Sequence, residues 1–172
     1  MAQTSESIQA ELARHHRTAA MVVGAMLGLT VALVVIAFVA VDALYRPADP
    51  SLAMALFITI LIFALGSFVL RRTRFQPMRL QDIAALRGIS GLLATLRNTT
   101  IQIAFIGGAI ALMGFMAMIM THNEYHMLRA GGVAAIVLIS AYPQRSAWQR
   151  LVRAIEKESG NADDSPAKGI VA

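Results

Sequence analysis

The chain of 172 residues is 57% hydrophobic and only 15% charged, which leaves too few polar side chains to cover a water-soluble domain of this size. Because it contains no cysteine, disulfides, thiolate metal sites and a cysteine nucleophile are excluded. Its net charge of +5 is carried mainly by arginines beside long uncharged runs, so we interpret it as membrane-flanking charge and expect no nucleic-acid partner.

Residues 1–17 are polar and end in a basic run, Arg14–Arg17. The uncharged run that follows, residues 18–41, is longer than the hydrophobic core of a signal peptide and long enough to span a bilayer. Basic segments beside spans remain in the cytoplasm. Residues 1–17 are therefore predicted to be a cytoplasmic N-terminal helix that leads into a retained first span.

A small-residue ridge lies within this first span. It consists of residues that recur every four positions, Ala20, Gly24, Gly28 and Ala32. Small side chains at this spacing let two helix backbones approach closely, which favours helix association in lipid. We predict that this ridge packs against another helix. The pattern leaves open whether that helix belongs to the same chain or to another copy.

The first span is followed by a short turn, residues 42–50, that contains acids, prolines and a tyrosine of the kind found at membrane interfaces. A second uncharged run then extends to Leu70. Residues 18–70 are predicted to form a first transmembrane hairpin, with its turn outside the cell.

The most basic stretch, residues 71–97, separates two long apolar regions, and its charge predicts a cytoplasmic position. We expect a linker helix here that either lies on the membrane surface or extends the third span. Four arginines stand close together near its start, Arg71, Arg72, Arg74 and Arg79. Our hypothesis is that they hold anionic lipid headgroups; the alternative is that they only set the topology.

Residues 98–144 are predicted to form a second transmembrane hairpin. Its first helix carries another small-residue face, formed by Gly107, Gly108, Ala111 and Gly114. The last span is short, but four spans place most of the Lys and Arg on one side of the membrane, whereas three would divide them almost equally. The positive-inside bias therefore favours four spans, with the N- and C-termini both cytoplasmic.

His122 and His126 stand four residues apart in the turn of this second hairpin. On a helix they would share one face, which is the geometry of a zinc or copper pair. Two neutral ligands in a wet turn are an incomplete set, so we favour a capped helix start. We expect no metal and no other cofactor.

The end of the chain is predicted as two segments. Residues 145–158 carry an apolar stripe with arginines nearby, and we expect an interfacial amphipathic helix with Trp148 in the headgroup zone. Residues 159–172 have no apolar period and are predicted to be disordered.

The fold prediction is an all-α integral membrane protein with four transmembrane helices in two hairpins and cytoplasmic amphipathic helical segments, located in the plasma (inner) membrane. No acid, base or histidine lies in the middle of a span, and no phosphate-binding loop or HExxH motif is present. We therefore predict that the protein is not an enzyme. The favoured function is a scaffold, assembly factor or accessory subunit of a membrane complex, as a homo-oligomer or with other subunits, in a bilayer with anionic headgroups.

The alternative function is a channel or transporter for a small neutral or anionic solute. The polar residues at the start of the third span, Asn98, Thr99, Thr100 and Gln102, would then line its mouth. A water-filled path lined by these residues would favour transport, whereas tight apolar packing favours the scaffold.

Overall fold

The computed structural model describes residues 2–46, 50–74, 76–150 and 153–154, and this part of the chain is helical with no strand. Its elements are α1 (Ala2–Leu44), α2 (Pro50–Arg74), α3 (Pro77–Thr121) and α4 (Glu124–Ala141). A short helical stretch, residues 145–150, follows α4. The tail that is predicted to be disordered, residues 159–172, lies outside the described residues.

Four helices in the described part of the chain are long and apolar enough to cross a membrane, judged by length and composition. The candidate spans are Ser7–Leu44, Ser51–Arg74, Gly88–Thr121 and Glu124–Arg150. The expectation of an all-helical chain with four candidate spans is therefore confirmed, and these helices indicate a membrane protein.

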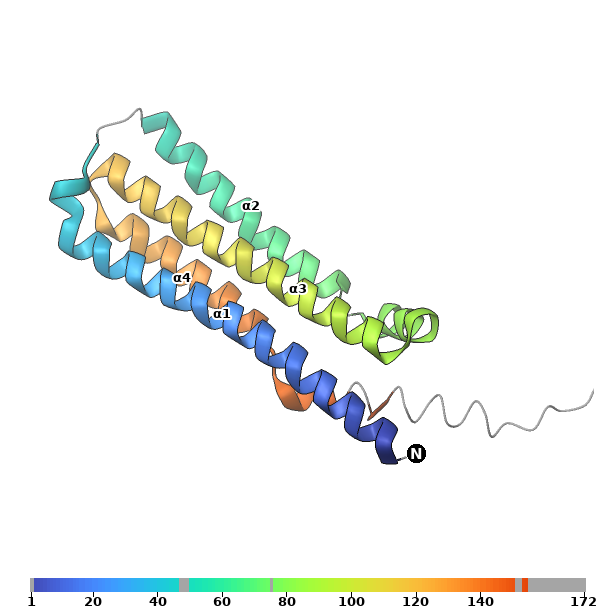
Figure 1. Cartoon of the computed structure of the whole chain (residues 1–172). Helices are drawn as coiled ribbons and strands as arrows, with labels where there is room; N and C mark the ends of the chain where they lie inside the picture. Colours follow the sequence, from blue (N-terminus) through green and yellow to red (C-terminus); the bar gives the residue numbers. More distant parts are fainter. Residues whose placement is uncertain (1, 47–49, 75, 151–152, 155–172) are drawn as a thin grey trace, which may run out of the picture.

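The helix α3 lies at the centre of the assembly, where it packs against α1, α2 and α4. In Figure 1, α2 runs along one side of α3, while α4 and α1 lie on the other. The helices α1, α3 and α4 all pack on one another, whereas α2 packs on α3 and, less extensively, on α4. The helix α2 is thus the most peripheral of the four.

The interior between the helices is apolar and includes residues from all four of them. Its buried members are Leu33, Ala37, Ile60, Ile103, Ile110, Ala111, Met118, Met127, Ala130, Ala134, Val137 and Ala141. The contact between α3 and α4 is close because α3 has glycines there. A Cβ atom at Gly107 would stand 2.8 Å from Cγ of Leu138, and one at Gly114 would overlap Cβ of Ala130.

The helices α1 and α3 have 43 and 45 residues. Each is about twice the ~20 residues that a membrane span requires. Both therefore continue beyond the uncharged runs that begin after Arg17 and Arg97. Of the two alternatives for the linker, the structure adopts the extension of the third span over residues 88–97. At Gly88 the helical geometry breaks, with φ of 67°, and Figure 1 shows the start of α3 turning away from the rest of the helix.

The extensions of α1 and α3 pack together and cover Trp148, which follows α4. We call this second apolar cluster the head cluster; it comprises Leu12, Ala19, Leu92, Leu93, Leu96 and Trp148. Only 5% of Trp148 is exposed, because α1 and α3 extend far enough to cover the indole.

Candidate functional site

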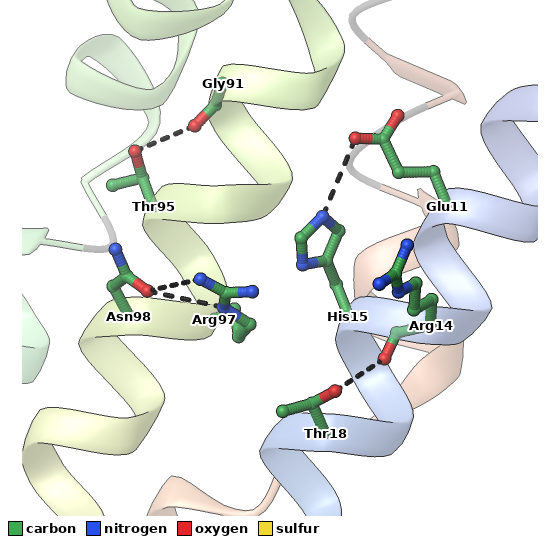
Figure 2. Close-up of polar contacts among 8 residues, drawn as sticks. All are labelled: Glu11, Arg14, His15, Thr18, Gly91, Thr95, Arg97 and Asn98. Atoms are coloured by element: carbon green, nitrogen blue, oxygen red, sulfur yellow. Dashed lines mark hydrogen bonds and ion pairs between the residues drawn. The ribbon is translucent and has the colours of Figure 1, made fainter.

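A cavity lined mainly by polar residues lies between the extensions of α1 and α3. Its volume is about 620 Å³. The lining residues are Ala10, Glu11, Arg14, His15 and Thr18 from α1 and Arg97 from α3. We call this cavity the α1–α3 pocket. Figure 2 shows the α1 side chains on one side of it and Arg97 on the other.

The two arginines of the α1–α3 pocket are cations that form no ion pair with another described residue. Among the described residues, no carboxylate lies within ion-pair distance of Arg14 or Arg97. Arg97 donates from Nε and Nη2 to Oδ1 of Asn98 over 3.3 and 3.1 Å. Because that amide is neutral, it orients the guanidinium without neutralising its charge.

The acid of the pocket faces its histidine. Oε1 of Glu11 lies 3.6 Å from Nε2 of His15, one helical turn further on, and the His15 side chain is 15% exposed. Figure 2 shows the imidazole between the two helices. Nδ1 of His15 is buried without a hydrogen-bond partner among the described residues. The Glu11 carboxylate therefore faces His15 and forms no ion pair with Arg14 or Arg97.

The head cluster holds the two walls of the α1–α3 pocket in place. Leu12 is buried beside Glu11 on α1, and Leu96 is buried beside Arg97 on α3. On the same helices, Thr18 and Thr95 each donate a hydroxyl hydrogen bond to their own backbone, to the carbonyls of Arg14 and Gly91. Neither hydroxyl ties one helix to the other, so it is apolar packing that sets the spacing of the walls.

A second cavity, of about 440 Å³, lies among α2, α3, the end of α4 and the chain that follows it. Its lining is mixed: Arg71 and Thr100 are among its polar residues, and Ile103, Ile139 and Trp148 are among its apolar ones. Arg71 is thus the member of the predicted lipid-headgroup cluster that borders a cavity. Arg72 and Arg74 are exposed at the end of α2, and the side chain of Arg79 lies outside the described residues.

The two small-residue faces lie in opposite environments. On α1, Ala20 is half-buried and Ala32 is exposed, and a Cβ atom at Gly24 or Gly28 would meet nothing within 4 Å. On α3, the residues Gly107, Gly108, Ala111 and Gly114 are all buried. The α3 face therefore packs within the chain, whereas the α1 ridge faces outward.

The residues of the predicted mouth do not share one surface. Asn98 and Gln102 are exposed, whereas Thr99 and Thr100 are buried. Thr100 donates its hydroxyl to the carbonyl of Leu96 within the same helix. The four residues therefore do not line a common path.

The histidines of the second turn contact different helices. Nε2 of His122 lies 3.3 Å from Oδ1 of Asp42, and the ring of His126 lies 4.7 Å from that of Phe57. The helix α4 begins with a cap, in which Oδ1 of Asn123 accepts from the backbone of Tyr125 over 3.0 Å. In the part of the chain that the structure describes, no three His, Cys, Asp or Glu side chains form a group that could hold a metal ion.

Comparison of the chain with protein-family models, curated proteins and solved structures finds no match. By sequence alone, Arg14 and His15 are only part of the basic run before the first span, and Arg97 is only the end of the linker. Arg97 directly precedes the uncharged run of α3, and Arg14 stands four positions before the uncharged run of α1. The sequence does not indicate that the N-terminal part of α1 packs beside the part of α3 that precedes its uncharged run.

Proposed function

We propose that this protein is a non-enzymatic scaffold or accessory subunit of a membrane complex, and that it binds its partner through the ridge on α1. The observation that carries the proposal is the outward direction of Gly24 and Gly28. Glycine inside a helix costs about 1 kcal/mol relative to alanine, and a Cβ atom at either position would meet none of the described residues within 4 Å. Close approach of a second helix would provide a compensating contact.

The spacing of the two glycines separates them from other open glycines of the chain. Gly66 on α2 and Gly132 on α4 also have nothing within 4 Å. Neither has a second open glycine four residues away on its helix. The α1 ridge therefore has the extended small surface that a helix–helix contact requires.

The interior supports a scaffold more than the transport alternative. The buried polar residues of the described spans are Thr30, Ser67, Thr99 and Thr100. Thr30 and Ser67 return their hydroxyls to the carbonyls of Met26 and Ala64 in their own helices. Polar groups satisfied in this way do not form a continuous hydrophilic path for a solute.

The proposed topology is two transmembrane hairpins with both termini in the cytoplasm, in the plasma (inner) membrane. This topology follows from the distribution of arginine. Arg14 and Arg97 lie at the same end of the helices, and positively charged residues beside spans are retained in the cytoplasm. Because the chain has no cysteine, single cysteines can test it in intact cells with a membrane-impermeant maleimide. Tyr125→Cys should be labelled directly, and Gln144→Cys only after permeabilisation. The reverse labelling would invert the topology.

Cross-linking in native membranes tests the α1 contact. A cysteine in place of the exposed Val31 should form a disulfide with a second copy, or cross-link to another membrane protein that mass spectrometry identifies. The double variant Gly24→Leu/Gly28→Leu should lose the cross-linked product and keep the melting temperature of the parent in detergent. Gly66→Leu is the matched control, because it adds the same side chain to another open glycine.

Two results would overturn the proposal. One is a cross-linked product that survives Gly24→Leu/Gly28→Leu as well as it survives Gly66→Leu. The other is solute flux into liposomes that contain the purified protein, with the double variant as active as the parent. That result would favour the channel or transporter.

A further inference from the structure

The α1–α3 pocket combines two features that bind phosphate groups. It is a half-open hollow between two helices, and it places the guanidinium groups of Arg14 and Arg97, which have no ion-pair partner among the described residues, on different helices. Guanidinium groups donate paired hydrogen bonds whose geometry matches the oxygens of a phosphate. Cations from two helices can approach one anion from two directions, which a row of arginines on a single helix cannot do.

The depth of the pocket indicates where such a phosphate would lie. Thr18 begins the uncharged run of α1, and Arg97 directly precedes the uncharged run of α3. Both walls of the pocket therefore change from charged to uncharged at the same level. In a chain inserted through its apolar runs, this level is that of the lipid headgroups.

We propose that the α1–α3 pocket binds the phosphate of an anionic phospholipid, with Arg14 and Arg97 as its direct contacts. Glu11 is the one acid of the lining, and it is directed to His15. The pocket keeps a net positive charge, because two arginines face a single carboxylate. The same chemistry would accept the phosphate of a soluble ester. The lipid is favoured because the anionic leaflet presents phosphates at this depth.

This site differs from the arginine cluster at the end of α2. Arg72 and Arg74 are exposed and follow one another along a single helix, so they attract a charged leaflet without enclosing a headgroup. The α1–α3 pocket, by contrast, has walls from α1 and α3 that the head cluster holds at a fixed spacing. Selective retention of individual lipid molecules is therefore expected of the pocket rather than of the cluster.

The test is a binding titration with the full-length protein in a neutral detergent. Phosphatidylglycerol, phosphatidylcholine, glycerol phosphate and inorganic phosphate are added separately. Retained lipid is counted by native mass spectrometry, and the melting temperature is recorded. Phosphatidylglycerol should bind and raise the melting temperature of the parent more than phosphatidylcholine does. Arg14→Gln and Arg97→Gln should each weaken that binding about tenfold, the effect of losing charge-assisted hydrogen bonds worth about 1.5 kcal/mol.

Arg17→Gln is the matched control, because Arg17 is exposed on the same helix and does not line the pocket. Arg14→Lys and Arg97→Lys keep the charge and provide a second pair of variants if a glutamine variant melts early without lipid. They should retain weakened binding, since lysine cannot donate the paired hydrogen bonds. Equal loss in Arg17→Gln and Arg14→Gln would overturn the pocket in favour of diffuse charge.

The four ligands distinguish the sources of the phosphate. Selective binding of phosphatidylglycerol supports the lipid. An equal shift with glycerol phosphate or inorganic phosphate, lost in Arg97→Gln, would overturn the lipid and identify a soluble phosphate ligand. The outcome is independent of the proposed scaffold function, because Gly24→Leu/Gly28→Leu leaves the pocket intact and should bind lipid like the parent.

Discussion

Nε2 of His16 donates a hydrogen bond of 2.8 Å to the carbonyl oxygen of Pro143, a residue 127 positions later in the chain. The same imidazole meets the ring of Trp148 edge-on, with 5.9 Å between ring centroids. One side chain therefore joins the extension of α1 to the segment that follows α4. This contact closes the head cluster, which in turn holds the wall that α1 contributes to the α1–α3 pocket.

Replacement of His16 by alanine should loosen the head cluster. It removes the hydrogen bond to Pro143 and the ring contact with Trp148, and a hydrogen bond of this kind contributes about 1 kcal/mol. Since Trp148 is the only tryptophan of the chain, its fluorescence reports on this place alone. We expect red-shifted emission and stronger quenching by acrylamide.

Arg17→Ala is the control for His16→Ala, because the neighbouring Arg17 is exposed and its loss leaves the indole covered. Trp148→Phe should cost less stability than Trp148→Ala, since a ring still fills most of the site. Unchanged quenching in His16→Ala would show that the burial of Trp148 does not depend on the imidazole.

Replacement of a glycine by valine should lower the melting temperature on α3, where the glycine is buried, but not on α1, where it is exposed. Gly114→Val places a side chain against Ala130, and overpacking of this kind costs about 1–3 kcal/mol. Gly24→Val enters open space and should leave the melting temperature of the detergent-solubilised monomer unchanged or slightly higher, because valine has a higher helix propensity than glycine. Thermal melts of the purified variants measure the difference.

Gly108 provides a graded comparison for this series. A Cβ atom there would stand 2.8 Å from Sδ of Met26, and a methionine side chain can move aside. Gly108→Ala should therefore melt closer to the parent than Gly114→Ala. Equal melting temperatures for Gly114→Ala and Gly108→Ala would mean that α3 and α4 separate easily at Ala130.

The uncharged runs predicted three of the four candidate spans, and the distribution of Lys and Arg added the short fourth, because length and charge are properties of composition. Composition does not tell which face of a helix meets a neighbour. The pattern around Gly24 and Gly28 resembles that around Gly107 and Gly114, yet the first faces outward and the second is buried. The two glycine patterns differ only in whether a neighbouring helix packs against them, and the sequence does not show which helices are neighbours.

The same reason explains why the α1–α3 pocket was not predicted. Arg14 and Arg97 are 83 positions apart by their numbers in the sequence, and each one alone looks like a residue that flanks a span. Their common cavity arises because α1 and α3 are both longer than a bilayer requires and pack against each other where they extend outside the uncharged runs. A helix extension is visible in the sequence as a stripe such as Leu92 and Leu96, but its partner is not.

The hypothesis for Arg71, Arg72, Arg74 and Arg79 predicts that they anchor the first part of α3 to an anionic membrane. Gly88 has a positive φ, so the helix before it is not held in line with the rest of α3 and needs an anchor of its own. A spin label on Asp82→Cys, an exposed position, reports the mobility of that part in liposomes. In the parent, the label should be slower in anionic than in neutral liposomes, since each surface cation contributes about 1 kcal/mol of attraction.

Glutamine at all four arginine positions should abolish this difference between anionic and neutral liposomes while insertion is retained. Insertion should survive because Arg97, Arg145 and Arg150 still bias the topology. The control replaces Arg145 and Arg150 by glutamine, which lowers the net charge without touching the cluster; its label should remain slow in anionic liposomes. Salt should weaken the effect in the parent, because the attraction is screened within a Debye length. If the fourfold variant and the parent show the same label mobility in both kinds of liposome, the cluster sets topology only.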